Sequence, residues 1–550
     1  MNAPQTQADV LVVGAGPVGL SVAMDLSARG AKVIIAETRA YKQPPEVKCN
    51  HVAARTMERF RKLGVAQKLR NAGLPEDFPN DVAFRTTATG TELARIRIPG
   101  RRDRYISRDG PDTGWPTPEP AHRINQTFLE PILVEHTAAL PGVTLLNRTQ
   151  VTGFTQDAHG VEATLRDLET NEERNIRARF LIGCDGGSSM VRKAIGAKFE
   201  GTPVIQQVQS TFIRAPKLLA MLPRPLYWCM YAVNPRRCGS MFAIDGKETW
   251  LIHNHLNPGE KDFDAIDRDW AIRTILGVGD DFEYEVISKE DWVGRRLVAN
   301  RFRDRNVFIA GDAAHLWVPY AGYGMNAGIA DGLNLSWLLG AVLQGWGDAK
   351  ILDAYEAERQ PITQQVSNFA MEHAAKMIRA RSAVPVNIEA DDEAGQRERE
   401  RMGKEAYELN VQQFAAGGLN FGYYYDASPI IAYDGEPPPA YSMGGFTAST
   451  VPGCRAPHFW LADGRSIYDA FGPGYTLLRL DRAIDIEPLV RAARGRRMPL
   501  EVLDVQGVVV PPAYRHKLLV VREDQHVAWR GDVLPQDACA LVEALRGKRD

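Results

Sequence analysis

The sequence predicts a mixed α/β fold in which a β-sheet domain is inserted into a domain of alternating strands and helices. Three observations predict it. Residues 8–37 have the pattern of a strand, a glycine-rich turn, a helix and a second strand. Residues 200–295 are rich in the β-branched and aromatic residues that favour strands. Residues 305–345 return to the order of strand, turn and long helix.

The first stretch has the spacing of a dinucleotide-binding turn. An apolar strand over residues 9–13 is followed by Gly14, Gly16 and Gly19 in G-x-G-x-x-G spacing. Gly14 permits the tight turn, Gly16 lets the backbone approach a pyrophosphate, and Gly19 lets the helix pack on the strand. The second strand ends at Glu37, which suits a ribose hydroxyl. A glycine turn without a ligand fits less well, so we expect a Rossmann-like domain holding a nicotinamide or flavin dinucleotide.

The amino-acid composition excludes several other classes of protein. With 550 residues, 44% hydrophobic and 24% charged, the chain is globular and long enough for several domains. A net charge of −2 gives no electrostatic reason for a nucleic-acid partner. The six cysteines never form C-x-x-C, and no run reaches the roughly 18 apolar residues of a membrane span. We expect a cytoplasmic protein with a small-molecule partner, no membrane association and no metal.

Residues between these landmarks predict further elements. Alternation around Thr89-Gly90 indicates a hairpin over residues 82–99. The pattern LIGCDGGSSMVR at 181–192 repeats the order of strand, glycine-rich loop and helix. Other expected elements are helices within 48–64 and 122–140, strands at 144–146, 160–166 and 175–180, and the aromatic strands LYWCMYAV, SMFAI and TWLIHNHL.

The last third differs in character. Residues 389–410 form a charged tract that predicts a solvent-facing helix acting as a connector. From about residue 420 the turn density rises, and strands at 475–480, 500–504 and 517–522 alternate with a helix at 485–494. This spacing is typical of a βαβ unit.

Three separated motifs together resemble one known family. They are GAGPVG at 14–19, CDGGSSMVR at 184–192, and AGDAAH with GYGMNAGIADGLNL between 310 and 335. The chain resembles the single-component FAD-dependent aromatic hydroxylases, the para-hydroxybenzoate hydroxylase and phenol hydroxylase group, over residues 8–380. The late segment PGCRAPHFWLADGRSIYDAFGPGYTLL resembles the thioredoxin-like C-terminal domain of the longer members.

The resemblance implies a division into four parts. They are a discontinuous FAD-binding domain (1–80, 105–198 and 297–390), a substrate-binding β-sheet domain (81–104 and 199–296), a helical connector (391–419) and a thioredoxin-like domain (420–550).

The resemblance also implies bound FAD, with NADPH or NADH as a transient reductant. Asp312 offers a carboxylate acceptor to the ribityl hydroxyls, and the helix that begins near Gly324 stabilises negative charge on the reduced flavin. Lys48 stands where the family commonly has arginine, which keeps the charge and loses the bidentate fork. The implied cofactor residues are Gly14, Gly16, Pro17, Gly19, Glu37, Thr38, Lys48, Gln126, Asp185, Asp312, Gly324, Met325 and Asn326.

The implied reaction is hydroxylation of a phenolic ring with NAD(P)H and O2 through a flavin C4a-hydroperoxide. The protein then has to position the ring and exclude water, and needs no side-chain nucleophile. The candidate substrate residues are Asn50, Tyr227, Trp292 and Pro319. His253 and His255 share one face of an expected strand, where core or surface roles are favoured over ligation.

Two alternatives stay open at this point. One is a hydroxylase of a fused polyketide or quinone-type ring. The other is a flavin-binding protein without catalysis, which NAD(P)H consumption stimulated by substrate would distinguish. A homodimer is also left open, and the residues do not specify the ring substituents.

Overall fold

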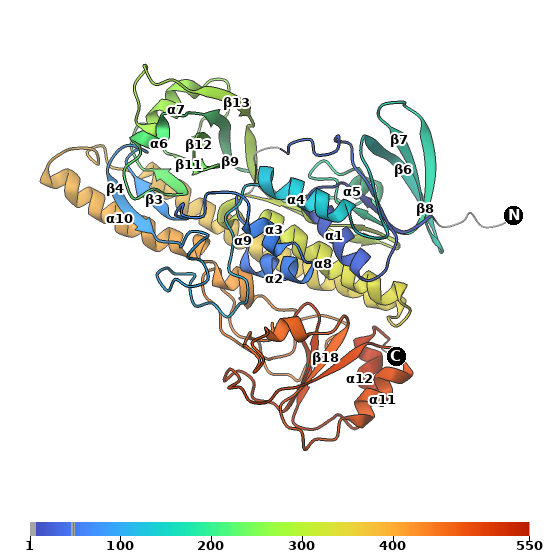
Figure 1. Cartoon of the computed structure of the whole chain (residues 1–550). Helices are drawn as coiled ribbons and strands as arrows, with labels where there is room; N and C mark the ends of the chain where they lie inside the picture. Colours follow the sequence, from blue (N-terminus) through green and yellow to red (C-terminus); the bar gives the residue numbers. More distant parts are fainter. Residues whose placement is uncertain (1–6, 46–47, 49, 549–550) are drawn as a thin grey trace.

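The computed structural model describes residues 7–45, 48 and 50–548. Within these residues the strands form three sheets. Figure 1 shows the first sheet in the centre and right, the second at the upper left, and the third, in red, at the bottom. Helices α1, α4, α8 and α9 run through the middle of the molecule. The mixed α/β fold expected from the sequence is confirmed.

The first sheet has the order β15-β16-β8-β1-β2-β5, with the β6–β7 hairpin beside β8. Its core strands β16, β8, β1, β2 and β5 are parallel. Parallel neighbours put the carboxyl ends of their strands at one edge of the sheet. The strands are β1 (Ala8–Val13), β2 (Val33–Ala36), β5 (Val143–Leu146), β6 (Thr149–Asp157), β7 (Gly160–Asp167), β8 (Glu173–Gly183), β15 (Arg303–Asp304) and β16 (Val307–Ile309).

The second sheet has the order β17-β14-β9-β12-β11-β10-β3-β4, with β13 paired to β9. The expected hairpin around Thr89-Gly90 is confirmed, because β3 and β4 pair antiparallel on either side of it. Its shortest strand, β17, comes from the loop that follows β16. The strands are β3 (Val82–Arg85), β4 (Glu92–Ile96), β9 (Phe199–Arg214), β10 (Cys229–Ala232), β11 (Gly239–Ala243), β12 (Thr249–His255), β13 (Glu285–Lys289), β14 (Trp292–Ala299) and β17 (His315–Trp317).

Close packing of α8 on α1 positions the glycine turn. A Cβ on Gly332 would lie 2.6 Å from the Val22 side chain, and one on Gly328 would lie 2.8 Å from the Cα of Gly311. Glycine is therefore needed at both sites. The helices before the third sheet are α1 (Pro17–Ala28), α2 (Ala54–Lys62), α3 (Ala66–Arg70), α4 (Gln126–Ala138), α5 (Met190–Ala194), α6 (Leu218–Met221), α7 (Arg268–Leu276), α8 (Gly324–Leu343), α9 (Asp353–Ser382) and α10 (Glu393–Phe414).

The third sheet has the order β19-β18-β20-β21. Strand β18 is parallel to β19, which it reaches through α11, and the remaining pairs are antiparallel. This βαβ unit followed by a hairpin and a helix is the expected thioredoxin-like arrangement. Its elements are β18 (Tyr475–Arg479), α11 (Glu487–Gly495), β19 (Leu500–Asp504), β20 (Leu518–Arg522), β21 (Val527–Gly531) and α12 (Ala538–Leu545).

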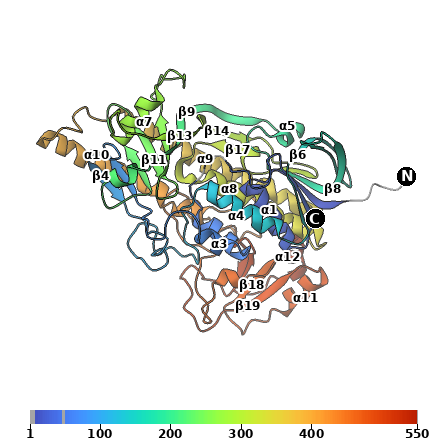
Figure 2. The ribbon, with the colours of Figure 1, turned by 45° about the horizontal axis from the view of Figure 1, so that its top comes forward.

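Helix α10 does more than the sequence indicated. The expected helix is present, but one side of it packs against β4, and Figures 1 and 2 show the two side by side. A Cβ on Gly403 would lie 2.2 Å from the carbonyl oxygen of Leu93. The last residues, Gln413 and Phe414, are buried. The expectation of a solvent-facing connector is therefore wrong for this side of the helix, which belongs to the core.

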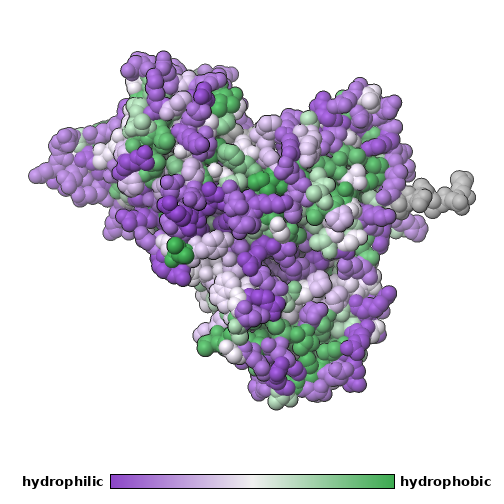
Figure 3. Space-filling model, viewed as in Figure 1, coloured by the Kyte–Doolittle hydropathy of each residue, from purple (hydrophilic) through white to green (hydrophobic). Residues whose placement is uncertain are grey.

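The surface seen in Figure 3 is mostly hydrophilic, with hydrophobic side chains scattered among polar ones. Such scattering is usual in a globular protein. None of the helices in the described part of the chain combines the length and the hydropathy of a bilayer-crossing helix.

Candidate active site

A cavity of about 1190 Å³ lies where the edge of the first sheet meets a face of the second. Its lining comes from the ends of β1, β2 and β8, from the loop after β16, and from β9, β11, β12 and β14. The volume exceeds the roughly 300–1,000 Å³ typical of a single small-molecule site. The cavity therefore has room for a large ligand together with a second one.

The glycine turn lies at one end of this cavity. Gly14 has a φ of 103°, and a Cβ there would lie 2.4 Å from the carbonyl oxygen of Cys184. A Cβ on Gly19 would lie 2.1 Å from the carbonyl oxygen of Gly14, so this glycine lets α1 pack on the turn. Gly16 lines the cavity with no atom within 4 Å of its Cβ position. The open backbone at the start of α1 fits a diphosphate.

Glu37 anchors the turn from the end of β2. Its Oε2 accepts the N–H of Ala15 at 2.7 Å, and its Oε1 accepts the N–H of Arg39 at 2.9 Å. Burial alone would raise the pKa of Glu37, but hydrogen bonds from Arg39 and its charge lower it overall. The carboxylate therefore stays ionised, and both Glu37 and Thr38 line the cavity.

The second and third glycine-rich loops are joined to each other. Asp185 accepts hydrogen bonds from Ser189 Oγ at 2.5 Å and from the N–H of Met190 at 2.7 Å, which caps helix α5. From that helix, Arg192 Nη1 donates to the carbonyl oxygen of Ala313 at 3.2 Å. These contacts hold Asp185 at the cavity wall beside the loop after β16.

Asp312 is the carboxylate most open to the cavity. Among the described residues, no protein group donates a hydrogen bond to its side chain. The side chain is exposed to the cavity, and the surrounding cavity walls limit its hydration and thereby raise its pKa. It is thus free to accept hydroxyl groups of a ligand. Gly324 and Met325 line the same cavity at the start of α8, where partial positive charge favours an anion.

Asn326 is directed away from the cavity. Its Oδ1 accepts the N–H of Ala53 at 2.8 Å, and its Nδ2 donates to the carbonyl oxygens of His51 and Gly322. The side chain thereby ties the start of α8 to the loop before α2. Asn326 positions the cavity wall rather than forming it, since it is not among the lining residues.

Four further expected residues line the cavity. Lys48 Nζ lies 3.1 Å from Glu290 Oε1, and Gln126 Nε2 donates to Glu130 at 2.9 Å. Asn50 also lines the cavity, and its Oδ1 accepts from Asn125 Nδ2 at 2.5 Å. Pro17, at the start of α1, completes this group.

The structure corrects the expectation for Tyr227. Its hydroxyl donates to the carbonyl oxygen of Ala88 at 2.7 Å, and the guanidinium groups of Arg85 and Arg95 lie 5.7 and 5.8 Å from the centre of its ring. Tyr227 precedes β10, so the alternation of that strand does not extend to it. Tyr231, inside the strand, lines the cavity and replaces it as a candidate.

Trp292, the first residue of β14, and Pro319, from the loop after β17, both line the cavity. The ring of Trp292 meets that of His253 edge to face at 5.9 Å. Several residues there were not singled out from the sequence, because their elements are far apart in the chain. Those lining the cavity are Arg123, Gln206, Ser210, Trp228, Tyr231, Ser240, Phe242, Leu251, Trp317, Tyr320, Gln413 and Phe414.

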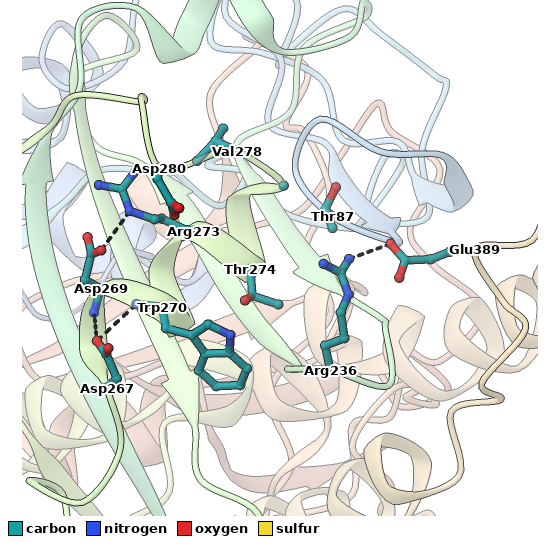
Figure 4. Close-up of a pocket in the computed structure, with 11 residues that line it drawn as sticks. Thr87, Arg236, Asp267, Asp269, Trp270, Arg273, Thr274, Val278, Asp280 and Glu389 are labelled. Atoms are coloured by element: carbon teal, nitrogen blue, oxygen red, sulfur yellow. Dashed lines mark hydrogen bonds and ion pairs between the residues drawn. The ribbon is translucent and has the colours of Figure 1, made fainter.

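A second hollow, of about 620 Å³, lies beside α7 and is shown in Figure 4. Four of its charged groups form two ion pairs. Arg273 Nε donates to Asp269 at 2.7 Å, and Arg236 Nη2 donates to Glu389 at 2.7 Å. Asp267 caps the start of α7. These pairings give the hollow a structural explanation, so we do not treat it as a functional site.

The fold and the glycine-lined cavity define a dinucleotide-binding flavoprotein, and comparison with known proteins agrees. Residues 7–370 match the model of the FAD binding domain family, and residues 449–547 match that of the aromatic-ring hydroxylase C-terminal domain. The chain belongs to the single-component FAD-dependent aromatic hydroxylases, and it is an FAD-dependent monooxygenase.

Three similar proteins span nearly the whole chain. The FAD-dependent monooxygenase opdD of Penicillium oxalicum is 30% identical over 89% of this chain and 97% of its own length. The 2,4-dichlorophenol 6-monooxygenase of Cupriavidus pinatubonensis is 30% identical, over 98% and 96%. The rebeccamycin biosynthetic enzyme RebC, solved with reduced flavin, is 32% identical, covers 100% of both chains and has a TM-score of 0.89.

Proposed function

We propose that the protein hydroxylates a phenolic ring, with NADPH or NADH as the reductant and O2 as the oxygen source. The supporting observation is the single cavity that runs from the glycine turn to the aromatic-lined face of the second sheet. In the balanced reaction, one oxygen atom replaces a ring hydrogen as hydroxyl and the other leaves as water. The nicotinamide supplies the two electrons.

The residues present fit FAD. Gly16 offers open backbone for the diphosphate, and Asp312 offers an unoccupied acceptor. Glu37 follows β2, the position from which an acidic residue binds a ribose hydroxyl in dinucleotide-binding folds. FAD, when bound, supplies the hydride acceptance and oxygen activation that no side chain provides. The start of α8, at Gly324, stabilises negative charge in this part of the cavity.

The second-sheet wall suits an aromatic ring. Trp292, Trp228 and Phe242 present apolar surface to the cavity, and such walls exclude water from the reacting groups. Asn50 and Pro319 also line the cavity and come from loops rather than strands. We propose that these residues orient the ring, while Tyr231 takes the place first assigned to Tyr227.

We also propose the division of labour expected from the sequence. The first sheet and its helices bind FAD, the second sheet binds the substrate, and the third sheet carries no redox function. Cys454 and Cys539 support the last point, because they are unpaired: Cys454 is buried and Cys539 is exposed.

A fused polyketide ring is the second candidate substrate. The size of the cavity favours it, since about 1190 Å³ is generous for FAD and a single phenol. A putative polyketide hydroxylase of Streptomyces halstedii is also 29% identical over 82% of this chain.

The test is a substrate panel of single-ring phenols and fused hydroxylated rings, scored by mass spectrometry for a product heavier by one oxygen atom. Label from ¹⁸O2 should appear in that product. NAD(P)H oxidation alone is insufficient, because unproductive turnover yields hydrogen peroxide. Consumption without any oxygenated product across the panel would contradict the proposal.

A further inference from the structure

A chain of hydrogen bonds leads from the end of α9 into the second-sheet wall of the cavity. Arg381 Nη2 donates to Gln206 Oε1 at 3.2 Å, and the hydroxyl of Tyr320 donates to the same oxygen at 3.1 Å. Gln206 Nε2 lies 3.2 Å from His255 Nδ1, and His255 Nε2 lies 3.5 Å from Ser240 Oγ. All but Arg381 are buried and line the cavity.

The donor at the start of the chain fixes the direction of every bond. A guanidinium group can only donate, so the atom of Gln206 that meets Arg381 must be its carbonyl oxygen. The amide nitrogen of Gln206 then donates to Nδ1 of His255. In a neutral imidazole this places the proton on Nε2, which donates to Ser240 Oγ.

The end of the chain is a hydroxyl whose own hydrogen is not used. Ser240 accepts from His255, and no protein acceptor for the Ser240 hydrogen is found among the described residues. Among the described residues, the side chain of His253, its register partner on β12, makes no hydrogen bond to the Ser240 hydroxyl. Because Ser240 lines the cavity, its hydroxyl can donate to a ligand there.

We propose that Arg381 is a positioning residue for the substrate: through Gln206 and His255 it makes the hydroxyl of Ser240 a donor to the ring oxygen of a phenolate. The inference rests on the proposed function, since it specifies which form of a phenol the cavity binds. Burial lowers the pKa of His253 to about 4 and that of His255 well below its usual range, which agrees with neutral imidazoles.

Other groups face the same space. Arg123 and Tyr231 lie on neighbouring walls, and Glu290 lies near Lys48 at the cavity edge. The pH dependence of binding must therefore be compared between variants, because the contributions of these groups are the same in each variant and drop out of the difference. The probe is 4-nitrophenol, with 4-nitrotoluene as the same ring lacking the oxygen, and binding is followed by the absorbance change of the FAD-loaded protein.

Ser240→Ala removes the donor, and Gln206→Glu reverses the chain, because a carboxylate accepts from His255 Nδ1 and leaves Nε2 as an acceptor for Ser240. Both should weaken binding of the phenolate about 10- to 100-fold and raise the apparent pKa of the bound phenol. Binding of 4-nitrotoluene should not change. The matched control is Gln207→Glu, on the opposite face of β9, which should bind as wild type.

Arg381→Met should weaken phenolate binding in the same direction, and Arg381→Lys should restore it, because lysine also only donates. Melting temperature and FAD content exclude variants that fail to fold. Unchanged phenolate binding in folded Ser240→Ala and Gln206→Glu, an equal loss for both ligands, or no phenolate binding by the wild type would overturn the inference. Absence of hydroxylated product from the panel, with the binding pattern intact, would instead contradict the proposed function alone.

Discussion

Arg522 and Glu358 form a bidentate ion pair between the third sheet and helix α9, and neither side chain has any exposed surface. Arg522 Nη1 donates to Oε1 at 2.5 Å and Nη2 donates to Oε2 at 2.9 Å. The turn after β20 adds further ties to helices of the first domain. Glu523 accepts from Arg29 at 2.8 Å, and the carbonyl oxygen of Asp524 accepts from Arg55.

Glu358→Gln should destabilise the protein by about 3–5 kcal/mol, because it leaves the buried charge of Arg522 without its main partner. The measurement is the unfolding transition, followed by circular dichroism and by the change in FAD fluorescence when the cofactor is released. Glu398→Gln is the control, since Glu398 pairs with Arg401 on the exposed side of α10 and should change stability by less than about 1 kcal/mol. Equal losses in the free energy of unfolding for the two substitutions would show that the buried ion pair stabilises the protein no more than an exposed one.

Acid should loosen the same junction. Burial alone would raise the pKa of Asp524, but the charge of Arg522 holds it well below its ordinary value of 3.8. A carboxyl with a lowered folded pKa contributes stability that is complete above its ordinary pKa and is lost as pH falls through the folded value. Buried histidines such as His253 and His255, whose pKa values are lowered, already cost stability as pH falls below about 6.5, because the unfolded chain binds protons there. The loss from Asp524 should add a further fall in melting temperature below about pH 4.

Asp524→Asn should reduce stability at pH 7 and flatten this acid dependence, because the linked proton is no longer taken up. An acid limb of unchanged steepness in Asp524→Asn would assign the loss to other carboxyls, such as Asp25 and Asp331, whose pKa values are also lowered by neighbouring arginines.

Two glycines of the first turn should respond differently to alanine. Gly19→Ala places a Cβ 2.1 Å from a backbone oxygen that cannot move away, so folding should be impaired by about 1–3 kcal/mol and FAD lost. Gly16→Ala has space, so the protein should fold and bind FAD roughly tenfold more weakly, about 1.4 kcal/mol. Titration of the apoprotein with FAD measures both. An unchanged affinity of Gly16→Ala for FAD would contradict the assignment of the diphosphate site to the Gly16 backbone.

The aromatic residues of the second sheet separate into structural and ligand-facing ones. Tyr227→Phe removes only the hydrogen bond to Ala88, so it should lower stability by about 1 kcal/mol and leave KM unchanged. Trp292→Ala opens the cavity wall, so KM and the fraction of NAD(P)H lost as hydrogen peroxide should both rise. The ratio of product to NAD(P)H consumed is the measurement. A rise in KM for Tyr227→Phe with Trp292→Ala unaffected would reverse the assignment.

The parts that could be predicted from sequence are those with local signals. Gly14, Gly16 and Glu37 follow one another within a single strand, turn and helix, and the short aromatic strands β10, β11 and β12 alternate clearly. Each is recognisable because its period and its turn residues lie within a few positions of one another.

The rest depends on pairing between distant segments. Strand β9 extends over Phe199–Arg214, but its first half is exposed and lacks the alternation of a half-buried strand. Gln413 and Phe414 line the cavity from the end of α10. The charged sequence of that helix does not indicate this, because it follows from the packing of α10 on β4. The direction of the hydrogen bonds in the chain that begins at Arg381 likewise requires four separate elements to be in place, namely α9, β9, β12 and β11.

Strand β17 begins only three residues after Asp312, yet it pairs with β14 of the second sheet. The stretch of chain that carries Asp312, which we propose binds the ribityl group, is thus continuous with a strand of the second sheet, which we propose binds the substrate. An engineer who exchanges the substrate specificity of two such enzymes has to transplant residues 315–317 and the end of α10 together with the sheet itself. A chimera cut only at the ends of the insertion would combine the second-sheet strands of one parent with β17 and the end of α10 of the other.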